Sequence, residues 1–107
     1  MTISIQDFSE IDLRVAVINA VEEHPNADKL LVLKIDAGDG EKQLVAGIKN
    51  HYSAEELVGK TIVVVNNLAP AVLRGVESEG MLLAARDGDN VALLTTEKDV
   101  GPGSRVQ

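Results

Sequence analysis

Runs of β-branched and aliphatic residues with a period of two fill much of this 107-residue chain. The longest run, IDLRVAVINAV, extends from Ile11 to Val21, and its composition and period predict a strand. Two further runs, Leu30 to Ala37 and Gln43 to Ile48, flank the sequence GDGE, which is typical of a hairpin turn. The HPNAD sequence between the first two runs contains turn formers. The first half of the chain therefore predicts three consecutive strands.

One helix signal interrupts this pattern. Ser53 and Glu56 have the spacing of a capping box, and the helix that they begin is expected to end near Gly59. The next run, Thr61 to Asn66, has no polar face, which predicts a strand buried on both sides. A second helical turn is expected at the start of the chain, with Ser4 as its N-cap.

The second half of the chain is less regular. We expect an irregular segment from Ala71 to Gly80, then a hairpin of Met81 to Ala85 with Val91 to Thr95, and a loop in the tail GPGSRVQ. Three strands, a short helix and further strands form the layout of an all-β, five-stranded Greek-key OB-fold barrel, with its helix between strands 3 and 4. A β-sandwich is the alternative, but it usually needs about seven strands. The length predicts one domain, residues 1–107.

The residue inventory offers no chemistry for an active site. There are no cysteines, so disulfides and thiolate metal sites are excluded. The acidic clusters lack the later glutamate of a calcium-binding loop, and Ser78 does not lie in a nucleophile elbow. Both histidines, His24 and His51, are expected to be polar surface residues. We therefore expect a non-catalytic protein with no metal and no cofactor. Because no apolar run reaches the roughly 20 residues of a membrane span and no signal peptide opens the chain, a cytoplasmic protein without membrane contact is expected.

Binding remains as the function to consider. The net charge is −7, yet residues 42–86 contain five basic and four acidic residues, so the acids concentrate elsewhere. The stretch NNLAPAVLRGVESEGM contains three candidate binding residues. Arg74 can bind a phosphate through two N–H groups, and Ser78 can donate to a phosphate or sugar oxygen. Met81 can contact a base or ribose. In the alternative interpretation, Arg74 pairs with Glu77 and Met81 begins a core strand. One Phe and one Tyr leave little aromatic surface for base stacking.

Five motifs in order resemble one family: IDLRV, HPNADKLLVLKIDAG, YSAEELVGK, NNLAPAVLRGVESEGMLLAA and VGPGSRV. The chain is similar to the tRNA-binding domain found as the carboxy-terminal module or separate β subunit of methionyl-tRNA synthetases, in free-standing dimeric tRNA-binding proteins and in the endothelial-monocyte-activating polypeptide. The resemblance implies an OB-fold, tRNA binding with little sequence preference, a homodimer, and a methionyl-tRNA synthetase catalytic subunit as a further partner.

The resemblance also implies which residues bind tRNA. Carried over motif by motif, they are Lys29, Lys34, Lys49, Asn67, Arg74, Ser78 and Met81. Many relatives read L-K-P-A-K-L where this chain reads LAPAVL from Leu68 to Leu73, so two lysines are missing here. Each lost phosphate contact weakens binding and flattens its salt dependence. We therefore expect weak, salt-sensitive affinity.

A sister family offers a second function. Export-related chaperones of the same fold share the opening D-F-x-x-I-D-L-R-V pattern, although they usually lack the S-x-G-M stretch that this chain has at Ser78 to Met81. A chaperone-like or dimerisation module is therefore the alternative. Apolar side chains outside the expected barrel strands are candidates for a dimer interface or for packing over the open ends of the barrel: Ile3, Ile5, Phe8, Val100 and Val106.

Overall fold

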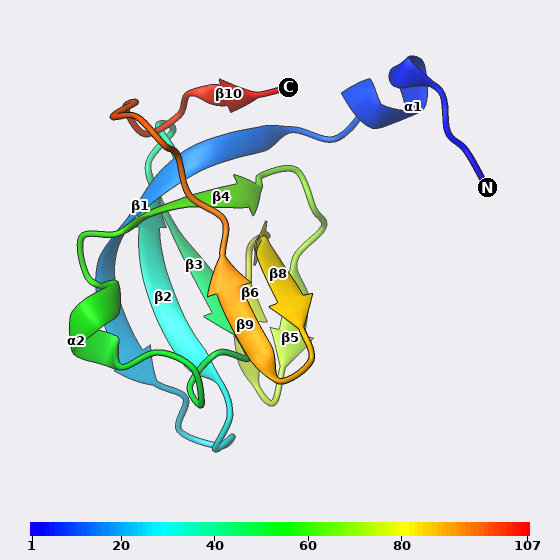
Figure 1. The fold of residues 1–107 in the computed structure, drawn as a ribbon. Helices are drawn as coiled ribbons and strands as arrows, with labels where there is room; N and C mark the ends of the chain where they lie inside the picture. The colour runs from blue at the N-terminus through cyan, green and yellow to red at the C-terminus, as the bar shows by residue number, and fades with distance from the viewer.

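The computed structural model describes all residues from Met1 to Gln107. Its elements follow the chain in this order: α1 (Ile5–Ser9), β1 (Leu13–Glu23), β2 (Leu31–Asp36), β3 (Glu41–Ala46), α2 (Ala54–Leu57), β4 (Thr61–Val65), β5 (Ala71–Leu73), β6 (Val76–Ser78), β7 (Met81–Leu82), β8 (Ala84–Asp87), β9 (Asn90–Leu93) and β10 (Arg105–Val106). The main sheet is antiparallel and is ordered β3-β2-β1-β4-β7, with β10 added to β1 (Figure 1).

The sheet curves into a nearly closed barrel, as the sequence predicts. The return from β6 to β7 meets β3, where the amide of Glu79 donates to the carbonyl of Gln43 at 2.8 Å. Strand β1 bends at a register shift between Ile18 and Ala20, so that it pairs with β4 at one end and with β2 at the other. The five-stranded OB-like barrel with α2 between β3 and β4 is therefore confirmed.

The core lies inside this barrel and follows the alternation of the strands. Ala16 and Ile18 of β1 have no exposed surface, and Leu33 and Ile35 of β2 face the same interior. The capping box at Ser53 forms as predicted and begins α2, and the predicted N-cap Ser4 also forms a capping box, with Asp7. This helix buries Leu57 completely against the core, so its single turn lies over one end of the barrel (Figure 1).

Two predictions of loops are wrong. The segment after Pro70 is a β5–β6 hairpin, because Arg74 and Gly75 form a two-residue turn with φ of 53° and 90°. Positive φ at both positions is the geometry of a type I′ turn, which fits the twist of the flanking strands. The tail contains β10, which pairs with the start of β1. The tail passes close to the turn after β2, and this contact requires glycine on both sides, because a Cβ on Gly38 would lie 2.6 Å from the Cα of Gly103.

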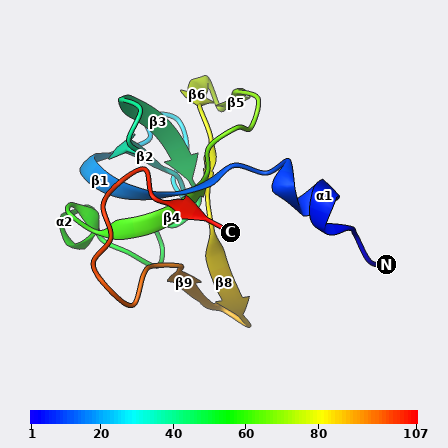
Figure 2. The same cartoon turned by 90° about the horizontal axis from the view of Figure 1, so that it is seen from above.

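The first helix stands apart from the barrel (Figure 2). It buries none of its residues, and Ile5 retains 71% of its exposure. A five-residue helix has little stability of its own, since nucleation is costly and few bonds follow it. No helix in the structure combines the length and apolar character needed to cross a membrane.

Candidate nucleic-acid interface

Two loops distant in the sequence meet at one end of the barrel. His24 begins the β1–β2 loop, and its Nε2 lies 2.8 Å from the carbonyl oxygen of Leu73 at the tip of the β5–β6 hairpin. Asn26 and Arg74 bond each other's backbone carbonyls, at 3.4 Å and 3.3 Å. These two loops correspond in position to those with which OB-folds bind oligonucleotides. We call this region the basic end and define it by Asn26, Lys29, Lys49 and Arg74.

Three of the predicted tRNA-binding residues lie at the basic end. The amide of Lys49 donates to the carbonyl of Lys29 at 3.4 Å, so their backbones are adjacent, and Lys29 shares its loop with Asn26. The Lys49 ammonium pairs with the carboxylate of Glu23, whereas the exposed Lys29 has no ion pair. The Arg74 guanidinium uses one N–H on Asn26 and keeps its other donors free for phosphate oxygens.

The structure engages Lys34 in hydrogen bonds within the sheet. It lies on β2 opposite Gln43 of β3, and its ammonium donates to the side-chain carbonyl of Gln43. The same amide group donates through its Nε2 to the backbone carbonyl of Glu77 at 2.8 Å. Lys34 therefore belongs to a polar network that joins β2, β3 and β6.

Two other predicted residues already use their polar groups inside the protein. Ser78 is buried, and its hydroxyl accepts from the amide of Val45 and donates to the carbonyl of Gly80, both at 3.0 Å. Its hydroxyl is therefore not available as a donor to a phosphate. Asn67 accepts from the amide of Asp12 at 2.9 Å and donates to the carbonyl of Glu10 at 2.7 Å. It fixes the end of β4 to the start of β1, away from the basic end.

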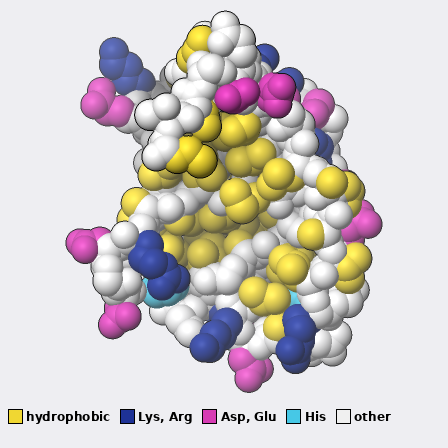
Figure 3. All heavy atoms as spheres, turned by 90° about the vertical axis from the view of Figure 1, so that its right-hand side faces the viewer, with side chains coloured by type: hydrophobic (Ala, Val, Ile, Leu, Met, Phe, Trp, Pro, Cys, Tyr) yellow, Lys and Arg dark blue, Asp and Glu magenta, His cyan; other side chains and the backbone are white.

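Met81 is one of several exposed hydrophobic residues in the second half of the chain. It lies at the start of β7 opposite Val65 and retains 48% exposure, so it begins a strand without entering the core. Other exposed hydrophobic residues before it are Leu68, Val72 and Leu73. Figure 3 shows hydrophobic side chains gathered in a hollowed surface, with Lys and Arg side chains along its lower edge.

The predicted dimer residues separate into two groups. Ile5, Phe8 and Val106 line one cleft of about 210 Å³ together with Ile11, between α1 and the C-terminal strand. Ile3 and Val100 are exposed but do not line this cleft. The apolar surface at this edge is therefore concentrated around α1 and β10.

The carboxylate of Asp12 lies near this second edge. A hydrogen bond of 2.9 Å from Nε of Arg14 is the largest effect on its pKa and lowers it. The guanidinium of Arg105 lies 3.9 Å away and acts in the same direction. Asp12 thus pairs with two arginines where β1 and β10 meet.

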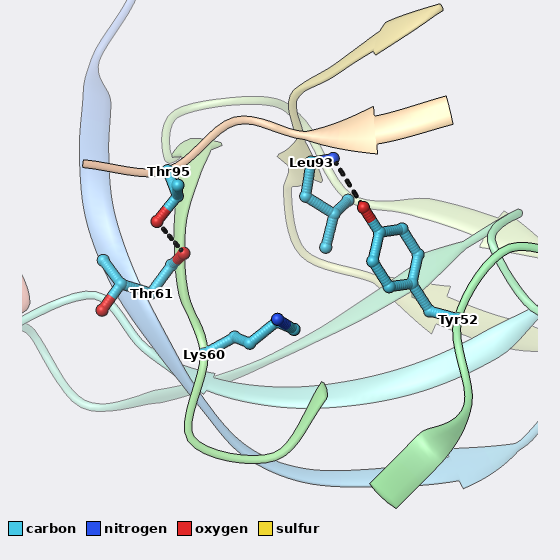
Figure 4. A pocket seen from close by; sticks show the side chains of 5 residues that line it. All are labelled: Tyr52, Lys60, Thr61, Leu93 and Thr95. Carbon is cyan, nitrogen blue, oxygen red and sulfur yellow. Dashed lines mark hydrogen bonds between the residues drawn. The ribbon is translucent and has the colours of Figure 1, made fainter. Parts of the chain in front are cut away.

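A smaller pocket lies between the loop before α2 and strand β9 (Figure 4). It measures about 120 Å³ and is lined by Tyr52, Lys60, Thr61, Leu93 and Thr95. The Tyr52 hydroxyl accepts from the Leu93 amide at 3.1 Å, and the ring packs against the core. Tyr52 is therefore held in place as a structural residue.

Sequence reasoning missed the residues that join the two loops. The HPNAD sequence predicts a turn and forms part of a family motif, but it gives no sign that His24 joins the loops; the expectation that His24 lies at the surface is wrong, because it is 6% exposed. A single polar residue adds nothing to the hydrophobic periodicity of a sequence. The burial of His24 can therefore be recognised only when its partner, distant in the chain, is known. No group of three or more His, Cys, Asp or Glu side chains is arranged to hold a metal.

Comparisons with known proteins show the family of the chain. A family model described as "Putative tRNA binding domain" matches residues 13–105. A methionine–tRNA ligase from Thermococcus kodakarensis is 53% identical over 105 residues, or 98% of this chain, and another from Thermotoga maritima is 56% identical over 104 residues, or 97%. The chain spans only 14% and 16% of the lengths of these two ligases.

Solved structures cover the whole chain. The MetRS related protein from Pyrococcus horikoshii is 33% identical with a TM-score of 0.93, covering 100% of this chain and 99% of that one. Chaperone CsaA from Bacillus anthracis is 31% identical with a TM-score of 0.90, and the match covers both chains fully. Since the family model covers most of the chain and the ligases share about half of its residues, this chain belongs to the tRNA-binding domain family.

Proposed function

We propose that this chain is a non-catalytic module that binds tRNA through the basic end, with little sequence preference. The observation that carries the proposal is the double connection of His24 to Leu73 and of Asn26 to Arg74. It brings together the two loops that OB-folds use for oligonucleotides, in a chain of the tRNA-binding domain family. The two loops supply Lys29 and Arg74 to this surface, and Lys49 of the β3–α2 segment lies beside Lys29.

The chemistry available there favours recognition of the sugar–phosphate backbone. Arg74 offers a planar fork, whereas Lys29 and Lys49 act as point charges. No free aromatic ring lies among the residues of the basic end, which speaks against base stacking as the source of affinity. Backbone contacts position a protein on a folded RNA without reading its sequence.

Affinity is expected to be weak and to depend on salt. The net charge of −7 opposes approach of a polyanion, and the Glu23 carboxylate competes for Lys49. Few phosphate contacts also mean a modest slope of log affinity against log salt, roughly 0.7 to 0.9 per contact.

A filter-binding titration with bulk tRNA tests the proposal. We expect retention at about 50 mM salt that falls steeply by about 200 mM. An unstructured RNA of equal length is the control for shape, and it should compete poorly. Absence of retention at low salt, or retention independent of salt, would refute tRNA binding by this surface.

The similarity to methionine–tRNA ligases suggests the setting in which the module works. It would serve such an enzyme as an appended domain, a separate subunit or a free-standing homologue, in the cytoplasm, and would deliver or retain tRNA for a catalytic subunit. Co-purification at low salt tests this setting and should recover a methionyl-tRNA synthetase with this chain.

We further propose a homodimer formed around α1. The helix exposes Ile5 and has no buried residue in the isolated chain, and Ile3 is exposed just before it. Beside it lies the apolar cleft that includes Phe8 and Val106. Docking on a second copy would bury these side chains, and the two basic ends would then act on one tRNA with increased avidity.

A chaperone-like role is the second candidate, because the structure exposes an apolar hollow (Figure 3) and resembles two CsaA chaperones. The two functions differ in their dependence on charge. Suppression of client aggregation that persists in high salt, without tRNA retention at low salt, would favour the chaperone. Loss of both activities in high salt would favour RNA binding.

A further inference from the structure

His24 is one of two buried polar residues in the structure, with 6% of its surface exposed. It follows directly after β1, and its amide donates to the carbonyl of Leu30 at 3.2 Å across the base of the β1–β2 loop. A buried polar side chain lowers stability unless its hydrogen bonds are satisfied. The partners of the imidazole therefore indicate what the residue does.

Both ring nitrogens are engaged with groups of fixed polarity. Nδ1 lies 2.9 Å from the amide of Asn26, which can only donate. Nε2 lies 2.8 Å from the carbonyl oxygen of Leu73, which can only accept. The ring must therefore carry its proton on Nε2 and be neutral, and it bridges the β1–β2 loop to the hairpin.

The hairpin needs this bridge at its tip. Its base is fixed to β3, where the buried Ser78 hydroxyl accepts from Val45 and the amide of Gln43 bonds the Glu79 carboxylate. A two-stranded hairpin is only marginally stable by itself. Gln43 also donates to the carbonyl of Glu77 in β6. Beyond Glu77, the hydrogen bonds that join the tip to the rest of the protein are those of His24 to Leu73 and the pair between Asn26 and Arg74.

We propose that His24 is a positioning residue for RNA binding, which fixes the Arg74 turn beside Lys29 without touching the RNA. This inference rests on the proposed function of the basic end. The Nε2 bond is made to the carbonyl of the residue immediately before Arg74. Without this bond the turn is free to move. RNA binding then carries the entropic cost of ordering the Arg74 guanidinium, which lowers the affinity.

The test is a double-mutant cycle of His24→Leu and Arg74→Ala, measured by filter binding with bulk tRNA at low salt. Each single variant should weaken binding by a similar factor, about tenfold, and the double variant should bind no more weakly than Arg74→Ala. His24→Gln, which retains a donor near the Nε2 position, should restore most of the affinity. A role confined to core filling would instead give losses that multiply.

A second readout does not require RNA. Trypsin cleaves after Arg74, and release of the tip should speed this cleavage in His24→Leu relative to cleavage after Arg105 in the same chain. If His24→Leu does not fold, Asn26→Ala removes the neighbouring side-chain bond to the Arg74 carbonyl and replaces it in the cycle.

The outcomes separate the two proposals. If the wild-type chain binds no tRNA, the proposed function fails and the positioning role fails with it. If Arg74→Ala weakens binding but His24→Leu does not, or if the two losses multiply in the double variant, the function survives and the role of His24 is refuted.

Discussion

Arg74 and Asn26 each donate a hydrogen bond to the other's backbone carbonyl, at 3.3 Å and 3.4 Å, across 48 positions of sequence. This reciprocal pair holds a cation at the tip of a hairpin against a loop that follows β1. Removal of the Arg74 side chain is therefore the most direct test of RNA binding.

Arg74→Ala should weaken binding of bulk tRNA roughly tenfold at low salt, because a charged donor to phosphate is lost. The slope of log affinity against log salt should also fall by about one. Lys98→Ala is the matched control, since Lys98 is exposed in the segment between β9 and β10, which runs to the opposite end of the barrel (Figure 1). Equal losses in both variants would indicate a general charge effect instead.

Ile5→Asp should convert the proposed dimer to a monomer, because it introduces a charge into the apolar surface of α1. Ile5 is 71% exposed in the isolated chain and lines the cleft beside β10. Val58→Asp is the control, because Val58 is 51% exposed after α2 and lies outside that cleft. Light scattering should give twice the chain mass for the wild type and Val58→Asp only. A monomeric wild type would remove the dimer.

Ser78→Ala should lower the free energy of unfolding by about 1–3 kcal/mol, because it leaves the Val45 amide and the Gly80 carbonyl without their buried partner. Ser9→Ala, at an exposed serine in α1, should change stability far less. Urea unfolding measures both. Where Ser78→Ala remains folded it should still bind tRNA, whereas selective loss of binding with unchanged stability would mean that Ser78 contacts RNA directly.

Acid should destabilise the protein partly through Asp12. The Arg14 hydrogen bond lowers the pKa of this carboxyl below its value in the unfolded chain, about 3.9, so the ionised form stabilises the native state above that pH. This contribution is lost as the pH falls through the lowered pKa of the folded state. Asp12→Asn should therefore show a smaller loss of unfolding free energy between pH 5 and pH 2. Parallel profiles for the two proteins would contradict this role.

Much of the barrel could be predicted from the sequence because its strands have strong periodicity. Ile11 to Val21 and Thr61 to Asn66 were recognised by β-branched runs, and Ser53 by its capping box. The β5–β6 hairpin was missed because its turn is Arg-Gly, which lacks the Asn-Gly or Asp-Gly signature. Strand β10 was missed because it has only two residues and so shows no periodicity. Its pairing with β1 accompanies a close contact between Gly38 and Gly103, which are distant in the sequence.

The candidate site was harder to predict than the fold. Motif resemblance identified Arg74, Lys29 and Lys49, which the structure brings to one end. It also identified Ser78 and Asn67, whose polar groups are used for internal bonds. Motifs do not distinguish a residue that contacts RNA from one that maintains the surface. That distinction depends on burial and on partners distant in the chain.

At Arg74 the left-handed backbone lowers the stability of the fold, whereas the guanidinium is proposed to raise the affinity for RNA. Arg74 is the only residue other than glycine with positive φ, a conformation that costs most side chains about 1–2 kcal/mol. Arg74→Asn would create the preferred Asn-Gly turn and relieve that strain, while it removes the guanidinium. The arginine at this position therefore lowers the stability of the turn in exchange for the charge on which the proposed RNA binding depends.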